Sequence, residues 1–183
     1  MARSKRPGAK PSGRPAAISP IPPGYPPIIP FLAVQGGAAA IDFYKKAFGA
    51  RELARETTAD GRVISARLKV GSSMFMLSDV FPGDDTASPS SVGTTTVSLQ
   101  FYTTDVERAW DRAVAAGATV VIPLEDAYWG ERHGHLLDPF GHHWSLAMRV
   151  PMSRAEKDRK RAEAYAAFAH GTHPHQAPTY SDA

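Results

Sequence analysis

The chain has 183 residues, of which 43% are hydrophobic and none is cysteine, and its formal net charge is +3. This apolar fraction is enough for a hydrophobic core, which excludes a wholly disordered chain, and no apolar run reaches the roughly 20 residues of a membrane-spanning helix. The lack of cysteine excludes disulfides, thiolate zinc sites, iron–sulfur clusters and cysteine nucleophiles. Because the basic N-terminus has no apolar segment of signal-peptide length, we expect a cytoplasmic protein.

The positive charge lies at the two ends of the chain. Residues 1–28 carry five basic residues and no acidic one, whereas residues 29–150 carry 11 basic and 14 acidic residues. A nucleic-acid-binding domain usually clusters Lys and Arg on its own elements, with aromatic residues among them. The central segment lacks that pattern, so we expect neither a nucleic-acid nor a membrane partner.

The first half of the chain contains a tail and a first structural unit. Residues 1–27 are rich in Pro, Gly, Ser and basic residues, so we expect a disordered tail there. The unit over residues 28–80 begins with an apolar strand over residues 28–34, and a helix follows that stops at Gly49. Three more strands are expected, over residues 51–57, 63–70 and 74–80.

The second half repeats this order after a linker over residues 81–94. In the unit over residues 95–150, Trp110 lies on a helical face and follows Phe43, its counterpart in the first unit, by 67 residues. The domain over residues 28–150 is therefore one β-α-β-β-β unit written twice, which predicts an α+β fold of two tandem modules.

A further helix is expected after the domain. Ser153 and Glu156 form a capping box, which predicts a C-terminal helix over residues 151–171. The remaining residues, 172–183, are expected to be a tail.

Three segments of the domain resemble the vicinal oxygen chelate superfamily, which includes glyoxalase I, bleomycin-resistance proteins and extradiol dioxygenases. They are FYKKAFGA, VSLQFYTTDVERA and YWGERHGHLLDPFGHHWSL, and they are most similar to the PhnB-like branch. The resemblance covers about residues 28–150. It implies that the modules pack into an incomplete barrel whose concave face holds a small-molecule ligand, and that the protein is a homodimer.

The resemblance also implies four positions for a metal ion. Metal-dependent members bind a divalent ion through inward His or Glu side chains, and by strand position these places fall here at Ile29, Met76, Ser98 and Ser145. Isoleucine and methionine side chains do not coordinate a hard or borderline cation, and a serine hydroxyl is a weak ligand. We therefore expect no metal at these positions and no other cofactor.

Alternation along the strands predicts which other side chains face the ligand. An apolar floor with a few neutral polar groups is typical of a small-ligand pocket, although the same residues could simply fill the sheet interior. Arg132 could hold a carboxylate or phosphate of the ligand, or instead pair with Asp138 or Glu131. Tyr128 and Trp129 could stack on a ligand ring or cover the mouth of the pocket. The expected ligand-binding residues are Phe31, Met74, Met76, Ser98, Gln100, Tyr102, Tyr128, Trp129, Arg132 and Ser145.

The histidines leave three interpretations open. His133 and His135 share one strand face, and the DPFGH turn could bring His143 diagonally to them, which gives an alternative site for zinc or iron. His135 alone could instead transfer a proton as a catalytic residue or touch the ligand. Hydrogen-bonded structural histidines are the third interpretation.

Three functions remain as hypotheses. The first is a protein that binds a small hydrophobic or aromatic molecule without a metal. The second is a metal-dependent lyase, isomerase or dioxygenase of the same superfamily with displaced His ligands. The third is an interaction module that uses the terminal helix and the basic tail.

Overall fold

The structure, a computed structural model, describes residues 19–170. Most of the expected N-terminal tail and all of the expected tail over residues 172–183 lie outside the described residues. The elements in chain order are β1 (Phe31–Val34), α1 (Gly37–Phe48), β2 (Arg51–Thr57), β3 (Val63–Val70), β4 (Ser73–Asp79), α2 (Pro89–Val92), β5 (Ser98–Tyr102), α3 (Val106–Ala115), β6 (Thr119–Ala127), β7 (Glu131–Leu137), β8 (His143–Arg149) and α4 (Arg154–Ala169).

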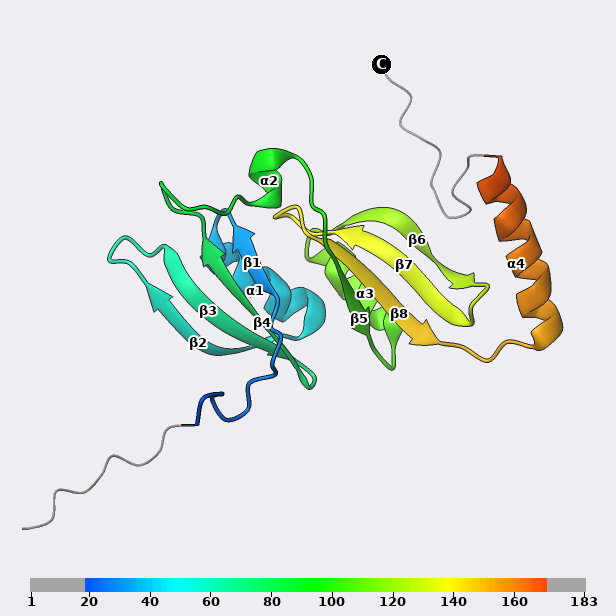
Figure 1. The fold of residues 1–183 in the computed structure, drawn as a ribbon, viewed down its shortest axis with the longest axis horizontal. Coiled ribbons are helices and arrows are strands. Elements are labelled where there is room, and N and C mark those ends of the chain that lie inside the picture. Colours follow the sequence, from blue (N-terminus) through cyan, green and yellow to red (C-terminus); the bar gives the residue numbers. More distant parts are fainter. Residues whose placement is uncertain (1–18, 171–183) are drawn as a thin grey trace, which may run out of the picture.

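Two modules of identical topology lie side by side (Figure 1). In the first, the strand order is β1-β4-β3-β2, with β1 parallel to β4 and the other neighbours antiparallel. The second has the same arrangement in the order β5-β8-β7-β6. The predicted α+β fold of two tandem β-α-β-β-β modules with a C-terminal helix is confirmed, and neither sheet closes into a barrel.

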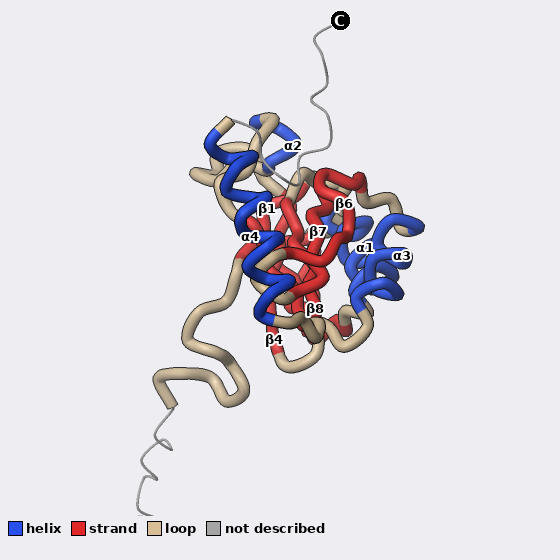
Figure 2. The backbone as a smooth tube through the Cα atoms, turned by 90° about the vertical axis from the view of Figure 1, so that its right-hand side faces the viewer, coloured by secondary structure: helices blue, strands red, loops and turns tan. Residues whose placement is uncertain are grey.

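Helices α1 and α3 cover the same side of the two sheets and contact each other. Figure 2 shows both helices on one side of the strands and α4 on the other. We call the sheet faces turned away from α1 and α3 the open faces. Gly49 ends α1 where the sequence predicts, with a φ of 66°, and Asp105 caps the start of α3 by accepting a hydrogen bond from the Arg108 amide. Helix α4 is shorter than the expected range of 151–171, because it begins after its cap Ser153 and ends at Ala169.

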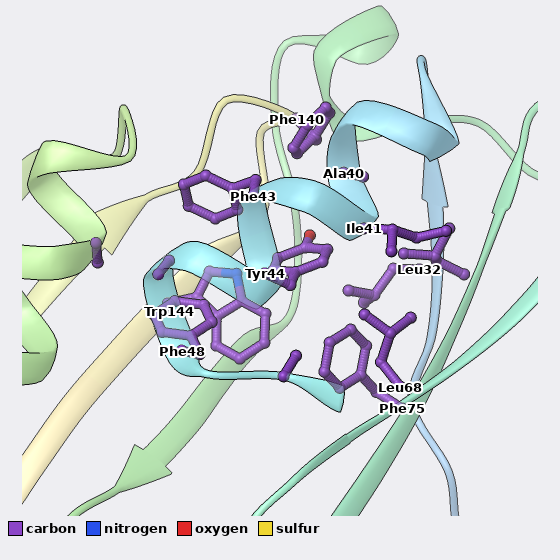
Figure 3. Packing of buried hydrophobic residues seen from close by; sticks show 14 of the residues in the cluster. Leu32, Ala40, Ile41, Phe43, Tyr44, Phe48, Leu68, Phe75, Phe140 and Trp144 are labelled. Atoms are coloured by element: carbon purple, nitrogen blue, oxygen red, sulfur yellow. The ribbon is translucent and has the colours of Figure 1, made fainter. Parts of the chain in front are cut away.

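An aromatic cluster joins the modules. The rings of Tyr44 and Phe48 on α1 lie against the Trp144 indole of β8, with the Phe48 and Trp144 ring centres 4.4 Å apart (Figure 3). Phe140 of the second module lies against Phe43 of the first. Burial of such large rings contributes strongly to stability, so the two modules share one core.

Two elements differ from the expectation. Strand β1 begins at Phe31 and not at residue 28, because Pro30 has no N–H to donate to a neighbouring strand. The segment over residues 81–94, expected as a linker, contains the short helix α2, which begins at a proline and ends at Gly93.

Helix α4 packs on the end of β6. Ser153 caps its first turn by accepting a hydrogen bond from the Glu156 amide, as the capping box predicts. Lys160 Nζ donates to the carbonyl oxygen of Asp126 at 3.0 Å, and Ala164 is buried at the contact. Over residues 19–170, no helix is long and apolar enough to cross a membrane.

Candidate functional site

The open faces of both sheets carry most of the predicted ligand-binding side chains. In β1 and β4, burial alternates, so that Leu32 and Phe75 point to the core while Phe31, Met74 and Met76 point to the open face. Phe31 pairs with Met76 across the two strands. These three expected residues therefore lie together on the first open face.

A cleft of about 600 Å³ lies between the two modules. Its floor is formed by Phe48 and Trp144, the rings that also join the modules. Met74 lies on the wall contributed by β4, and Gln100 and Tyr102 lie on the wall contributed by β5. The cleft thus brings together three of the predicted ligand-binding residues, from both modules, around an apolar floor.

A polar cluster lies next to this cleft on the second open face. The Tyr102 hydroxyl donates to one carboxylate oxygen of Glu131 at 2.9 Å, and Trp129 Nε1 donates to the other at 2.8 Å. The hydrogen bond with Glu131 raises the pKa of Tyr102 above its usual value. Glu131 therefore holds a tyrosine from β5 and a tryptophan from the β6–β7 turn beside each other.

Ser145 and His133 form a second pair on this face. Ser145 Oγ and His133 Nε2 are 2.6 Å apart, and the serine is buried. The rings of His133 and His135 are in edge contact, with centres 4.8 Å apart. Ser98 lies on the same face of β5 as Gln100, two residues before it.

Arg132 lies on the opposite face of β7. Its guanidinium donates to Glu107 of α3 at 2.6 Å and to Asp126 of β6 at 2.8 Å. Hydrogen bonds with these two carboxylates raise the pKa of Arg132. Because neighbouring residues of a strand point to opposite faces, Arg132 does not join Glu131 and His133. Arg132 therefore forms ion pairs, as one interpretation of the sequence proposed, but with Glu107 and Asp126 in place of Asp138 or Glu131.

The rings of Tyr128 and Trp129 are in edge contact, with centres 5.0 Å apart, and each ring also contacts a different partner. Tyr128 lies against Tyr165 of α4, with ring centres 6.0 Å apart, whereas Trp129 lies against His133 at 5.3 Å. Tyr128 is therefore part of the contact with α4, and Trp129 is part of the polar cluster.

The residues at the four implied metal positions do not fit a divalent ion. Ile29 and Met76 offer no hard donor, and the Ser145 hydroxyl is already hydrogen bonded to His133. His143 lies at the start of β8, beside Leu137 and Ser98, away from the His133 pair. Among residues 19–170, no group of three or more His, Cys, Asp or Glu side chains is arranged to hold a metal ion, and His133, His135 and His143 form no such group.

Two features of this site were not anticipated from the sequence. One is Glu131 as the common partner of Tyr102 and Trp129, and the other is the pairing of His133, not His135, with Ser145. The alternation of Glu131, His133 and His135 along one strand signals their shared face. The diagonal contact with Ser145 depends on the β7–β8 register, which pairs Ser145 directly with His135.

Comparison with known proteins gives consistent matches. Residues 28–146 match the Glyoxalase/Bleomycin resistance protein/Dioxygenase superfamily. Uncharacterized protein Mb0911c of Mycobacterium bovis is 47% identical over 128 residues, which are 68% of this chain and 84% of that protein. The crystal structure of TioX from Micromonospora sp. ML1 is similar with a TM-score of 0.55 and 29% identity, over 67% of this chain and 98% of that one. The PhnB protein from Bacillus cereus shares the fold, with a TM-score of 0.54 and 22% identity over 67% of this chain and 99% of that one.

Proposed function

Since the chain belongs to the Glyoxalase/Bleomycin resistance protein/Dioxygenase superfamily, we propose that it binds a small hydrophobic or aromatic molecule in the cleft between its two modules. The observation that carries this proposal is the cleft itself, which is lined by Phe48, Trp144, Met74, Gln100 and Tyr102. An apolar floor with a few polar groups at the rim is the usual composition of a small-ligand site.

The individual side chains support a planar, mostly apolar ligand. Tyr102 and Trp129 are both held by Glu131, so their rings are ordered before a ligand arrives, which lowers the entropic cost of binding. Met74 adapts its unbranched side chain to an irregular surface. The Gln100 amide can both donate and accept a hydrogen bond and so can orient one polar group of the ligand.

Binding is proposed to occur without a metal ion or other cofactor. The four residues at the metal positions are poor ligands, and this argues against a metal-dependent lyase, isomerase or dioxygenase using those positions. A cytoplasmic setting is proposed with it, in keeping with a chain that contains no cysteine.

A homodimer is part of the same proposal. Phe31 on the first open face and Trp129 on the second are 55% and 40% exposed, although both are large and mostly apolar. A second copy laid over the open faces would cover these side chains and enclose the cleft further. Light scattering should then give twice the monomer mass, and a monomeric mass at micromolar concentration would contradict it.

The binding proposal is tested with the fluorescent aromatic probe 8-anilinonaphthalene-1-sulfonate. We expect Tyr102→Ala to weaken binding of this probe about fivefold, because an aromatic contact contributes on the order of 1 kcal/mol. Tyr165→Ala is the matched control, since both tyrosines are 57% exposed but only Tyr102 lines the cleft. Equal probe affinity in the two variants, measured by fluorescence titration, would place the ligand elsewhere.

A further inference from the structure

The buried Ser145 hydroxyl and the His133 imidazole are arranged like a nucleophile and its base. Ser145 Oγ is 2.6 Å from His133 Nε2, which is the distance that proton transfer between the two groups requires. We propose that this pair carries out acyl transfer, hydrolysing a small ester through an acyl-Ser145 intermediate. The proposal adds a reaction to the binding function above and uses the adjoining surface of the second module.

His133 is held in place from several sides. Its ring contacts the edge of the Trp129 indole and the ring of His135, and Trp129 is itself held by Glu131. Glu125 of β6 lies directly opposite His133 in the β6–β7 pair, so the two side chains share the open face. A carboxylate at that position can favour the tautomer with the proton on Nδ1, which leaves Nε2 to accept the serine proton.

A hydrogen-bond donor lies on the other side of Ser145. Gln100 of β5 pairs directly with Ser145 of β8 in the parallel register, so the two side chains are neighbours on the same face. The Gln100 amide can donate to the oxyanion that forms when Oγ attacks a carbonyl. Two neighbouring rows of the second sheet therefore supply these groups: Gln100 and Ser145 are paired in one row, His133 and Glu125 are paired in the next, and the Ser145–His133 hydrogen bond joins the rows diagonally.

The reaction balances with these groups alone. Ser145 Oγ bonds to the ester carbonyl carbon while its proton passes to His133 Nε2, and the ester C–O bond then breaks as the leaving alcohol takes that proton. Water attacks the acyl-Ser145 carbon and gives a proton to His133, after which Oγ leaves and regains a proton. The products are the alcohol and the carboxylic acid. The apolar cleft beside Gln100 favours an ester with an aromatic or aliphatic group.

The test uses 4-nitrophenyl acetate with the full-length protein. We expect a burst of about one 4-nitrophenolate per chain and one acetyl group, which peptide mass mapping places on Ser145. Ser145→Ala should abolish both, and His133→Gln should slow the burst by a factor on the order of 10² to 10⁴. Ser78→Ala is the matched control, because Ser78 lies on the other sheet, and it should leave the burst unchanged.

A second variant keeps the test independent of folding defects. The chain contains no cysteine, so Ser145→Cys introduces a single thiol of similar size. This thiol should be acetylated, and more slowly when His133→Gln is added. Acetylation that is the same in wild type and Ser145→Ala, or that maps to lysines alone, would overturn the proposal.

The two proposals fail separately. Probe binding in the cleft that persists in a protein without serine acetylation would leave the binding function and remove the reaction. Acetylation of Ser145 in a protein that does not bind the probe would support the reaction and contradict the proposed binding function.

Discussion

Asp138 connects the two modules through its buried carboxylate. One oxygen accepts hydrogen bonds from the Tyr44 hydroxyl at 2.7 Å and from Trp144 Nε1 at 2.9 Å. The other accepts from the backbone amides of Phe140 and His142. Since Tyr44 belongs to α1 of the first module, this carboxylate spans the boundary. The DPFG motif thus does more than form a turn: its aspartate satisfies buried donors from both modules.

Loss of the Tyr44 hydroxyl should destabilise the protein. A hydrogen bond to a charged group contributes about 1.5–3 kcal/mol, so Tyr44→Phe should lower the free energy of unfolding by roughly 2 kcal/mol. Urea denaturation measures this change. Tyr165→Phe, which alters a tyrosine exposed on α4, should have no measurable effect. A loss of less than about 0.5 kcal/mol in Tyr44→Phe would mean that water replaces the hydroxyl.

The same tyrosine predicts how stability depends on pH. Burial, followed by the nearby Asp138 charge, raises the pKa of Tyr44 well above its ordinary value of 10.0. In the unfolded chain Tyr44 loses its hydroxyl proton near pH 10, whereas in the folded protein the hydroxyl stays protonated at that pH. The stabilisation is therefore complete below about pH 10 and is lost as pH rises above that value, by up to about 1.4 kcal/mol per pH unit.

This pH dependence is measured by urea denaturation of wild type and Tyr44→Phe between pH 9 and pH 11. The difference in free energy of unfolding between the two proteins should shrink above pH 10. A constant difference over this range would show that Tyr44 ionises with the same pKa in both states.

At the scale of elements, α4 depends on a small contact. Most of its side chains are exposed, including Tyr165 and Phe168, and Ala164 is its one buried residue among those described. Lys160 anchors the helix to the end of β6 through the Asp126 carbonyl. A helix held by so little buried surface should open locally before the modules unfold.

A charge at the buried position should release α4. Ala164→Asp places a carboxylate in the contact with β6, and we expect hydrogen exchange of the α4 amides to become at least tenfold faster, which corresponds to about 1.4 kcal/mol. Ala162→Asp is the matched control, because it makes the same change at an exposed position of the same helix. Equal exchange rates in the two variants would show that α4 does not depend on this contact.

At the scale of the whole molecule, the contact between modules creates the site. The shared aromatic core, the Asp138 carboxylate and a hydrogen bond between His142 Nε2 and the Ala33 carbonyl hold the modules side by side. The cleft is lined by residues of both modules, and neither module contains it alone. A repeated sequence unit thus gives a site that is not itself repeated.

The sequence by itself determined the order of the strands and of the helices other than α2, the duplication and the chemistry of the metal positions. These follow from local patterns: alternation along β3, the caps Asp105 and Ser153, and the glycine that ends α1. Residue types alone show that Ile29 and Met76 are poor ligands for a divalent ion. Such features are set by residue type and by the local order of residues, so they do not depend on the tertiary structure.

Only the tertiary structure decided which polar groups meet. Tyr44 and Asp138 are 94 positions apart, and His133 reaches Ser145 diagonally across two strands. The Arg132 side chain lies against α3, because the register of β7 places it on the face that the helices cover. Each of these contacts depends on strand register and on the packing of distant segments, and a shift of one residue would reverse the face of every side chain in the strand.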